Sequence, residues 1–229
     1  MNRRNILIGF GVVAAGAAAG GAWWLSRGRP GAPMASGGTA APTTTLAQAS
    51  GEMPIYDDDH ILGSADAPVT ILEFASLTCP HCAAFHTETL PQVKAEWIEQ
   101  GRARLVYRHY PLDQLALRAA AAANCVTGDG FFGFLEVLFK NQDKWTRSDD
   151  PLATIGQYAA LAGLDKATYE KCLSDEAAID RILEKQTAGR DRYNIASTPS
   201  FVINGTPVVG NQPYDEFNRV LEEAATKAS

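Results

Sequence analysis

The sequence has no excess of positive charge. Its 229 residues include 20 Lys and Arg against 26 Asp and Glu, a formal net charge of −6. The first 50 residues hold four of the basic residues and no acidic one, so the remainder carries a net charge of −10. Because nucleic acid and anionic lipid repel a body of that charge, we expect no nucleic-acid partner.

Internal repeats are lacking as well. Hydrophobic residues make up 46% of the chain and charged residues 20%. Such a composition can bury a substantial core, which excludes a disordered or fibrous protein. The part that follows the first 50 residues has the normal size of one domain with an elaboration.

An uncharged run of 20 residues, from Ile6 to Leu25, follows Arg3 and Arg4. A helix of that length can just cross the hydrocarbon core of a bilayer. We therefore assign residues 1–26 to a signal peptide or an N-terminal membrane anchor. The adjacent arginines resemble a twin-arginine export signal, and the Sec route stays open.

Cleavage of this segment also stays open. Arg27 and Arg29 follow the apolar run closely, as after an anchor, whereas Ala47-Gln48-Ala49 supplies the small residues of a late cleavage site. Residues 27–52 are rich in Pro, Gly, Ala and Thr and are predicted to form a flexible tether. Either outcome puts the domain of residues 53–229 in the periplasm or on the outer face of the cytoplasmic membrane.

A strand, a helix and a second strand are predicted where this domain begins. Residues 69–74 form a β-branched, mostly apolar run that contains one carboxylate, Glu73. Residues 79–99 have helical spacing, with Pro91 expected to kink or split the helix. Residues 104–110 have strand character, so the unit should make a parallel pair of strands.

The middle of the domain, at about residues 114–193, has helical patterns and is predicted to be a helical insertion. Strand character returns at residues 200–203 and 207–209, on either side of the hairpin signal Asn204-Gly205. A last helix closes the chain. The fold class is therefore α/β, with a sheet interrupted by an all-helical segment.

The chemistry is predicted at Cys79-Pro80-His81-Cys82. A lone pair of cysteines at this spacing can be a redox pair, half of a zinc site or a structural disulfide. Here the pair follows a strand and opens a helix, with Pro80 suited to the first helical position. Unpaired backbone N–H groups and the helix dipole then stabilise a thiolate at Cys79, and the His81 imidazole can add to this effect.

A stabilised thiolate at Cys79 is a good leaving group, and stabilising the reduced form makes the disulfide a stronger oxidant. Cys82 lies one turn further along the same helical face, where a resolving thiol must be to attack a mixed disulfide. The pair is therefore predicted to give its disulfide away.

A metal site is the competing interpretation. Cys79, Cys82 and His86 fall on one helical face, but no second Cys-x-x-Cys or His pair supplies a fourth ligand.

Other suggestive residues are expected to have structural roles or none. The aromatic residues between 131 and 145 are expected to form the core of the insertion, and the run of residues 57–59 a solvated acidic loop. His60, His86 and His109 have no partners visible in the sequence and are assigned no role.

The segment Glu73-Phe-Ala-Ser-Leu-Thr-Cys-Pro-His-Cys-Ala-Ala-Phe-His86 resembles the active-site segment of the DsbA-like thiol:disulfide oxidoreductases. The resemblance extends roughly from Gly63 to Ala225. It implies a thioredoxin-like fold with an inserted all-helical domain. It also implies protein disulfide oxidoreductase activity, with no cofactor beyond the redox-active Cys79–Cys82 disulfide.

Further residues take roles from this resemblance. Thr198-Pro199 resembles the family's cis-proline, whose preceding residue pairs its backbone with the substrate peptide. Glu73 matches the family's buried acid near the resolving cysteine. It would relay a proton to or from Cys82.

Cys125 and Cys172 both lie in the predicted insertion. Four cysteines in an exported domain make two pairs the economical expectation, so we predict a structural disulfide between them. Two buried free thiols are the alternative.

The sequence thus predicts an exported enzyme that inserts disulfides into reduced exported proteins by exchange at Cys79. The resemblance implies a quinone-linked membrane protein that reoxidises it, and the short, featureless tether favours a monomer. A thiol reductase or isomerase, in cytochrome maturation for example, is the alternative within the enzyme class. A metal-binding module using Cys79, Cys82 and His86 is the alternative outside it.

Overall fold

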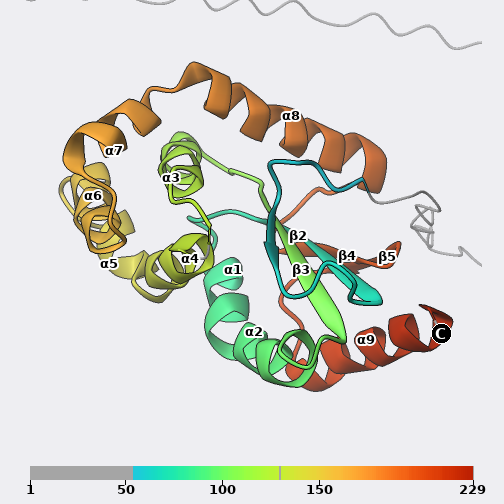
Figure 1. Cartoon of the computed structure of the whole chain (residues 1–229). Helices are drawn as coiled ribbons and strands as arrows, with labels where there is room; N and C mark the ends of the chain where they lie inside the picture. The colour runs from blue at the N-terminus through green and yellow to red at the C-terminus, as the bar shows by residue number, and fades with distance from the viewer. Residues whose placement is uncertain (1–53, 129, 229) are drawn as a thin grey trace, which may run out of the picture. The chain divides into compact units, whose positions relative to one another are not determined.

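The computed structural model describes residues 54–128 and 130–228 (Figure 1). Our expectations for residues 1–26 and 27–52 therefore lie outside the described residues. In the described part, no helix is both long enough and apolar enough to cross a membrane. The elements of this part are, in order, β1 (His60–Leu62), β2 (Val69–Ala75), α1 (Pro80–Ala84), the π-helical turn η1 (Phe85–Thr89), α2 (Leu90–Val93), the π-helical turn η2 (Lys94–Ile98), β3 (Ala103–His109), α3 (Gln114–Asn124), α4 (Gly130–Lys140), α5 (Gln142–Thr146), α6 (Pro151–Leu161), α7 (Lys166–Leu173), α8 (Glu176–Tyr193), β4 (Ser200–Ile203), β5 (Thr206–Val209) and α9 (Tyr214–Ala228).

The strands form one sheet in the order β1-β3-β2-β4-β5. β2 and β3 are parallel, which confirms the predicted strand-helix-strand unit, and every residue of β2 is buried. β4 is antiparallel to β2, and β5 is antiparallel to β4. The register sets Glu73 opposite Tyr107 and Ala75 opposite His109, so β2 and β3 carry polar side chains into the interior.

Helices cover both faces of the central strands. The segment from α1 to η2 and the helix α9 pack on one face, where the rings of Phe85, Phe201 and Phe217 lie between 4.6 and 5.4 Å apart. The C-terminal part of α8 packs on the other face, with Gly189 against the ring of Phe74. The core of this layered part therefore lies on either side of β2.

The helix predicted over residues 79–99 is one succession of α and π turns. We expected a kink or split at Pro91; the helical segments follow one another without a gap from Pro80 to Ile98, and the helix type changes from π to α at Leu90, beside Pro91. Pro91 lies in the first turn of α2, directly after the π-helical turn η1. The π-helical turn η1 is wider than an α-helical turn, and at its end the Leu90 N–H bonds to the Phe85 carbonyl. The helix therefore continues through Pro91, although proline has no N–H to donate.

Six helices, α3 to α8, lie between β3 and β4 and form a helical insertion (Figure 1). Buried aromatic side chains make much of its core, as the sequence predicted; these are Phe131, Phe134, Phe139 and Trp145. Aspartate side chains cap the first N–H groups of four of these helices. The capping residues are Asp113, Asp150, Asp165 and Asp175.

The predicted hairpin turn is confirmed. Asn204 and Gly205, between β4 and β5, have φ angles of 43° and 87°, the positive values that a tight hairpin turn requires. The Asn204 side chain also accepts a hydrogen bond from the Thr70 N–H at 2.8 Å. The turn is therefore tied to the start of β2.

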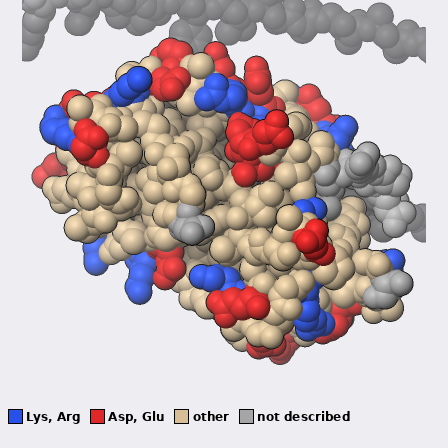
Figure 2. Space-filling model, viewed as in Figure 1, with Lys and Arg blue, Asp and Glu red and all other residues tan. Residues whose placement is uncertain are grey.

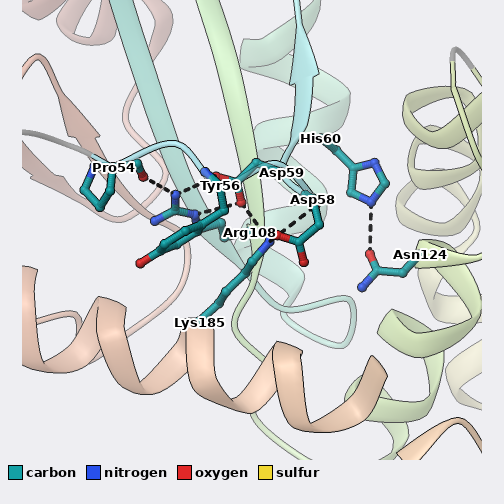
Figure 3. A network of polar contacts seen from close by, with 8 residues as sticks. All are labelled: Pro54, Tyr56, Asp58, Asp59, His60, Arg108, Asn124 and Lys185. Carbon is teal, nitrogen blue, oxygen red and sulfur yellow. Dashed lines mark hydrogen bonds and ion pairs between the residues drawn. The ribbon is translucent and has the colours of Figure 1, made fainter. Parts of the chain in front are cut away.

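The acidic run 57–59 is not a solvated loop throughout, because the side chain of Asp59 has no exposed surface. Its carboxylate accepts hydrogen bonds from Arg108 at 2.6 Å and from Lys185 at 3.0 Å (Figure 3). Burial alone would raise the pKa of Asp59, but the hydrogen bonds from Arg108 and from the Tyr56 N–H outweigh it and lower the pKa. These bonds fasten the segment before β1 to β3 and α8. The strand β1 was not predicted from the sequence, and it pairs antiparallel with β3.

Gly189→Ala should destabilise the protein, because the added Cβ would lie 2.5 Å from Cε1 of Phe74 in the buried contact between α8 and β2. We expect a loss of about 1–3 kcal/mol in the free energy of unfolding, measured by denaturant titration. Gly133→Ala in α4 is the matched control, since nothing lies within 4 Å of its Cβ. That substitution should stabilise the helix by about 0.5–1 kcal/mol. Equal effects of the two substitutions would contradict the close packing at Gly189.

Candidate active site

Cys79 stands at the N-terminus of α1. Its backbone is extended, and its carbonyl accepts hydrogen bonds from the N–H groups of Cys82 and Ala83, each at 3.1 Å. Pro80 is the first helical residue, a position where the missing N–H has no partner to lose. The side chains of Pro80 and His81 are exposed, whereas Cys79 and Cys82 are buried free thiols.

The helical insertion holds the loop that precedes Cys79. Gln142 of α5 donates hydrogen bonds to the carbonyls of Leu77 at 2.8 Å and Cys79 at 3.0 Å. The Thr78 hydroxyl donates to Asp113, the N-cap of α3, at 2.6 Å. These contacts could not be predicted from the sequence, because Gln142 is 63 residues away from Cys79 in the chain.

The two thiols differ in acidity. The pKa of Cys79 is lowered to about 5, chiefly by the hydrogen bond with the Cys82 thiol and against the effect of burial. The Thr198 side chain and the backbone N–H groups of Cys82 and His81 lower it further. In the reduced protein Cys79 is therefore a thiolate at neutral pH.

Cys82 is shifted in the opposite direction. Burial raises the pKa of Cys82, and the neighbouring Cys79 and Glu73 raise it further. Cys82 keeps its proton and donates it in a hydrogen bond to the Cys79 sulfur, which stabilises the Cys79 thiolate. Cys79 is thus a good leaving group, and Cys82 needs a proton whenever its bond to Cys79 breaks.

The loop before β4 lies beside Cys79. The Thr198–Pro199 peptide bond is cis, and the Thr198 carbonyl accepts a hydrogen bond from the Cys79 Sγ at 3.3 Å. The Thr198 hydroxyl is buried and has no hydrogen-bond partner among the described residues. It lowers the pKa of Cys79 because it can donate to the thiolate form.

Glu73 lies in the interior behind the redox pair. Its side chain is fully buried, and its Oε1 lies 2.9 Å from Nε2 of His86, whose side chain is 3% exposed. The other oxygen, Oε2, has no hydrogen-bond partner in the described part of the chain. The sequence assigned His86 no partner, although its position four residues after Cys82 places it on the same helical face.

The structure does not arrange Cys79, Cys82 and His86 as the ligands of one metal ion. His86 directs Nε2 to Glu73, and the described residues contain no group of three or more His, Cys, Asp or Glu side chains that could hold a metal ion.

Cys125 and Cys172 are joined by a disulfide, with their Cα atoms 6.3 Å apart. Cys125 directly follows α3 and Cys172 lies in α7, so the bond closes a loop within the insertion. The described chain thus holds one disulfide away from the Cys79–Cys82 pair.

The double variant Cys125→Ala/Cys172→Ala should lower the free energy of unfolding. The bond spans 47 residues of sequence. Loss of the constraint on the unfolded chain should cost about 4 kcal/mol, measured by denaturant titration under oxidising conditions. The thiolate titration of Cys79 should stay unchanged in this variant. An unchanged free energy of unfolding would contradict this prediction, because it would show that the Cys125–Cys172 disulfide adds no stability to the fold.

Cys79 should titrate with a midpoint near the pKa of about 5, followed by the ultraviolet absorbance of its thiolate in the reduced protein. Cys82→Ala should raise the midpoint most, because it removes the largest stabilising contact, and Thr198→Val should raise it by less. A midpoint at the ordinary cysteine value in the wild-type protein would contradict the geometry of the pair.

Comparison with known proteins places the chain in a family. A family model described as thioredoxin matches residues 56–223. A putative protein-disulfide oxidoreductase of Rickettsia bellii is 29% identical over 178 residues, which are 76% of this chain and 68% of the relative. A protein of Rickettsia felis with the same description is 28% identical, and the match covers 61% of its length. The chain thus spans about two thirds of the length of these two relatives.

Two further matches agree. A probable disulfide bond formation protein D of Bacillus cereus is 25% identical, over 77% of this chain and 83% of that protein. The crystal structure of alpha-DsbA1 from Wolbachia pipientis has a TM-score of 0.72 and 28% identity, and covers 77% of this chain and 94% of its own. These matches confirm the resemblance that the active-site segment indicated. The chain therefore belongs to the thioredoxin family, among its DsbA-like thiol:disulfide oxidoreductases.

Proposed function

We propose that the protein is exported and donates its Cys79–Cys82 disulfide to reduced proteins. The observation that carries this proposal is the opposite shift of the two thiols: the pKa of Cys79 falls to about 5 while burial raises that of Cys82. A fold that stabilises one thiolate so strongly favours the reduced pair over the disulfide. Such a disulfide is readily passed on to other thiols.

The exchange proceeds in two displacements. A substrate thiolate attacks Sγ of Cys79, the Cys79–Cys82 bond breaks, and Cys82 leaves with the electron pair and takes up a proton. A second substrate thiolate then attacks the substrate sulfur of the mixed disulfide. Cys79 leaves as the stabilised thiolate, the substrate gains one disulfide, and the enzyme is reduced by two electrons.

The residues around the pair have distinct roles in this proposal. Pro80 begins the helix that stabilises the thiolate, and His81 contributes its backbone N–H. Thr198, ahead of Pro199, would hold the substrate backbone beside Cys79, and Glu73 would supply the proton that Cys82 needs.

A relative described as a putative protein-disulfide oxidoreductase supports reduced exported proteins as the substrates. On the face viewed in Figure 2, basic and acidic side chains both occur.

Localisation and recharging complete the proposal. The apolar run after Arg3 and Arg4 supports export to the periplasm or to the outer face of the cytoplasmic membrane. A quinone-linked membrane protein would return the pair to the disulfide. The protein would act as a monomer, with no cofactor beyond its own disulfide.

The redox equilibrium of the pair against glutathione tests the direction of transfer. We expect a potential well above that of the cytosolic thiol pool, because the thiolate of Cys79 is stabilised. The oxidised protein should also form disulfides in a reduced, unfolded substrate protein. Cys79→Ala should abolish both reactions.

A potential near that of thioredoxin would contradict the donor proposal. It would make the protein a reductase instead.

A further inference from the structure

Release of Cys82 creates a proton-transfer problem. When the Cys79–Cys82 bond breaks, the Cys82 sulfur needs a proton, because burial raises the pKa of its thiol. Neither Cys82 nor Glu73 has any exposed surface. The proton must therefore cross the interior before it can reach either group from solvent.

His86 is the neighbour through which Glu73 can be recharged. The imidazole Nε2 lies 2.9 Å from Oε1 of Glu73, within hydrogen-bond distance. The ring stacks on Phe139 with a centroid distance of 4.1 Å and meets the edge of the Tyr107 ring at 5.9 Å. These contacts hold the imidazole in the orientation that faces the carboxylate.

His86 also borders a cleft on the surface. The cleft has a volume of about 260 Å³, enough for several water molecules. Among Cys82, Glu73 and His86, the only side chain that lines it is that of His86. Glu73 of β2 contacts the imidazole, and the Tyr107 ring of β3 packs against it. The charged residues that line the cleft together with His86 are Lys94 of η2, Glu99 after η2, and Glu136 and Lys140 of α4.

We propose that His86 is a proton-relay and positioning residue that links Glu73 to this cleft. The inference rests on the proposed function, because it concerns the proton that Cys82 takes up during disulfide donation. The Glu73 carboxyl gives its proton to the Cys82 sulfur, the protonated imidazole of His86 replaces it through Nε2, and water in the cleft protonates His86 again. Reoxidation of the pair runs the same transfers in reverse.

Tyr107 and His109 form a second conceivable route for the proton, but this route has no hydrogen bond to Glu73 within the described residues. The Tyr107 hydroxyl and both ring nitrogens of His109 are buried and have no hydrogen-bond partner in the described chain. Both residues line another cleft, near His60 and Asn124. No hydrogen bond joins Tyr107 to Glu73 within the described residues, whereas His86 has one. Tyr107→Phe is therefore the matched control.

The test is the rate at which the oxidised protein reacts with a reduced thiol peptide, measured from pH 5 to pH 8 in wild type, His86→Gln, His86→Ala and Tyr107→Phe. Glutamine keeps a hydrogen bond to Glu73 but cannot carry a proton by titration. We expect His86→Gln to slow the reaction about 10-fold or more. The ratio of wild-type to variant rates should change with pH, because an imidazole can gain and lose a proton and a glutamine amide cannot.

Two readouts separate a relay from a packing role. The equilibrium with glutathione should stay unchanged in His86→Gln, because a relay alters forward and reverse rates equally. Free imidazole should restore the rate of His86→Ala, because the cleft is open to solvent. Tyr107→Phe should react at the wild-type rate.

Wild-type rates in His86→Gln would overturn the relay, and so would a loss in His86→Ala that imidazole does not restore. An equal loss in Tyr107→Phe would also overturn it, because the route would then not run through His86 alone. Failure of the wild-type protein to donate its disulfide would instead overturn the proposed function.

Discussion

The hydrogen bond between the Cys82 thiol and the Cys79 sulfur is the interaction on which the active site depends. It exists because the two cysteines occupy one turn at the start of α1, with Cys79 at the helix N-terminus and Cys82 inside the core. The Cys79 sulfur thereby accepts the hydrogen bonds that stabilise its thiolate. The Cys82 sulfur lies in buried surroundings, where a negative charge is unfavourable. The same geometry makes Cys79 a good leaving group from its mixed disulfide with a substrate, and it makes Cys82 take up a proton when the Cys79–Cys82 bond breaks.

The rest of the fold maintains this asymmetry. β2 ends just before the cysteines and places Glu73 behind them, while the loop before β4 places Thr198 beside Cys79. The insertion contributes Gln142, whose side-chain amide donates hydrogen bonds to the carbonyls of Leu77 and Cys79 and so holds the loop before α1. The insertion is thus part of the active-site scaffold as well as a cover for it.

Local sequence patterns were sufficient for the elements that carry the chemistry. The apolar run of β2, the Cys-x-x-Cys pair at a helix start and the Asn204-Gly205 turn each have a short-range physical signature, so their structures could be predicted. The family resemblance added the pairing of Thr198-Pro199 with the redox centre. Partners that come from distant parts of the chain could not be predicted. Asp59 meets Arg108 across 49 residues, and Gln142 reaches Cys79 across 63.

The central claim is that the fold stabilises the reduced pair more than its disulfide, and the free energies of unfolding of the two forms test it most directly. The comparison is made in the variant Cys125→Ala/Cys172→Ala, so that only the Cys79–Cys82 pair changes oxidation state. The reduced form should be the more stable. Because the folded-state pKa of Cys79 is depressed to about 5, its advantage should be lost as the pH falls toward that value and should grow as the pH rises toward the ordinary cysteine range. A disulfide form that is more stable at every pH, as a structural disulfide would be, would contradict the claim.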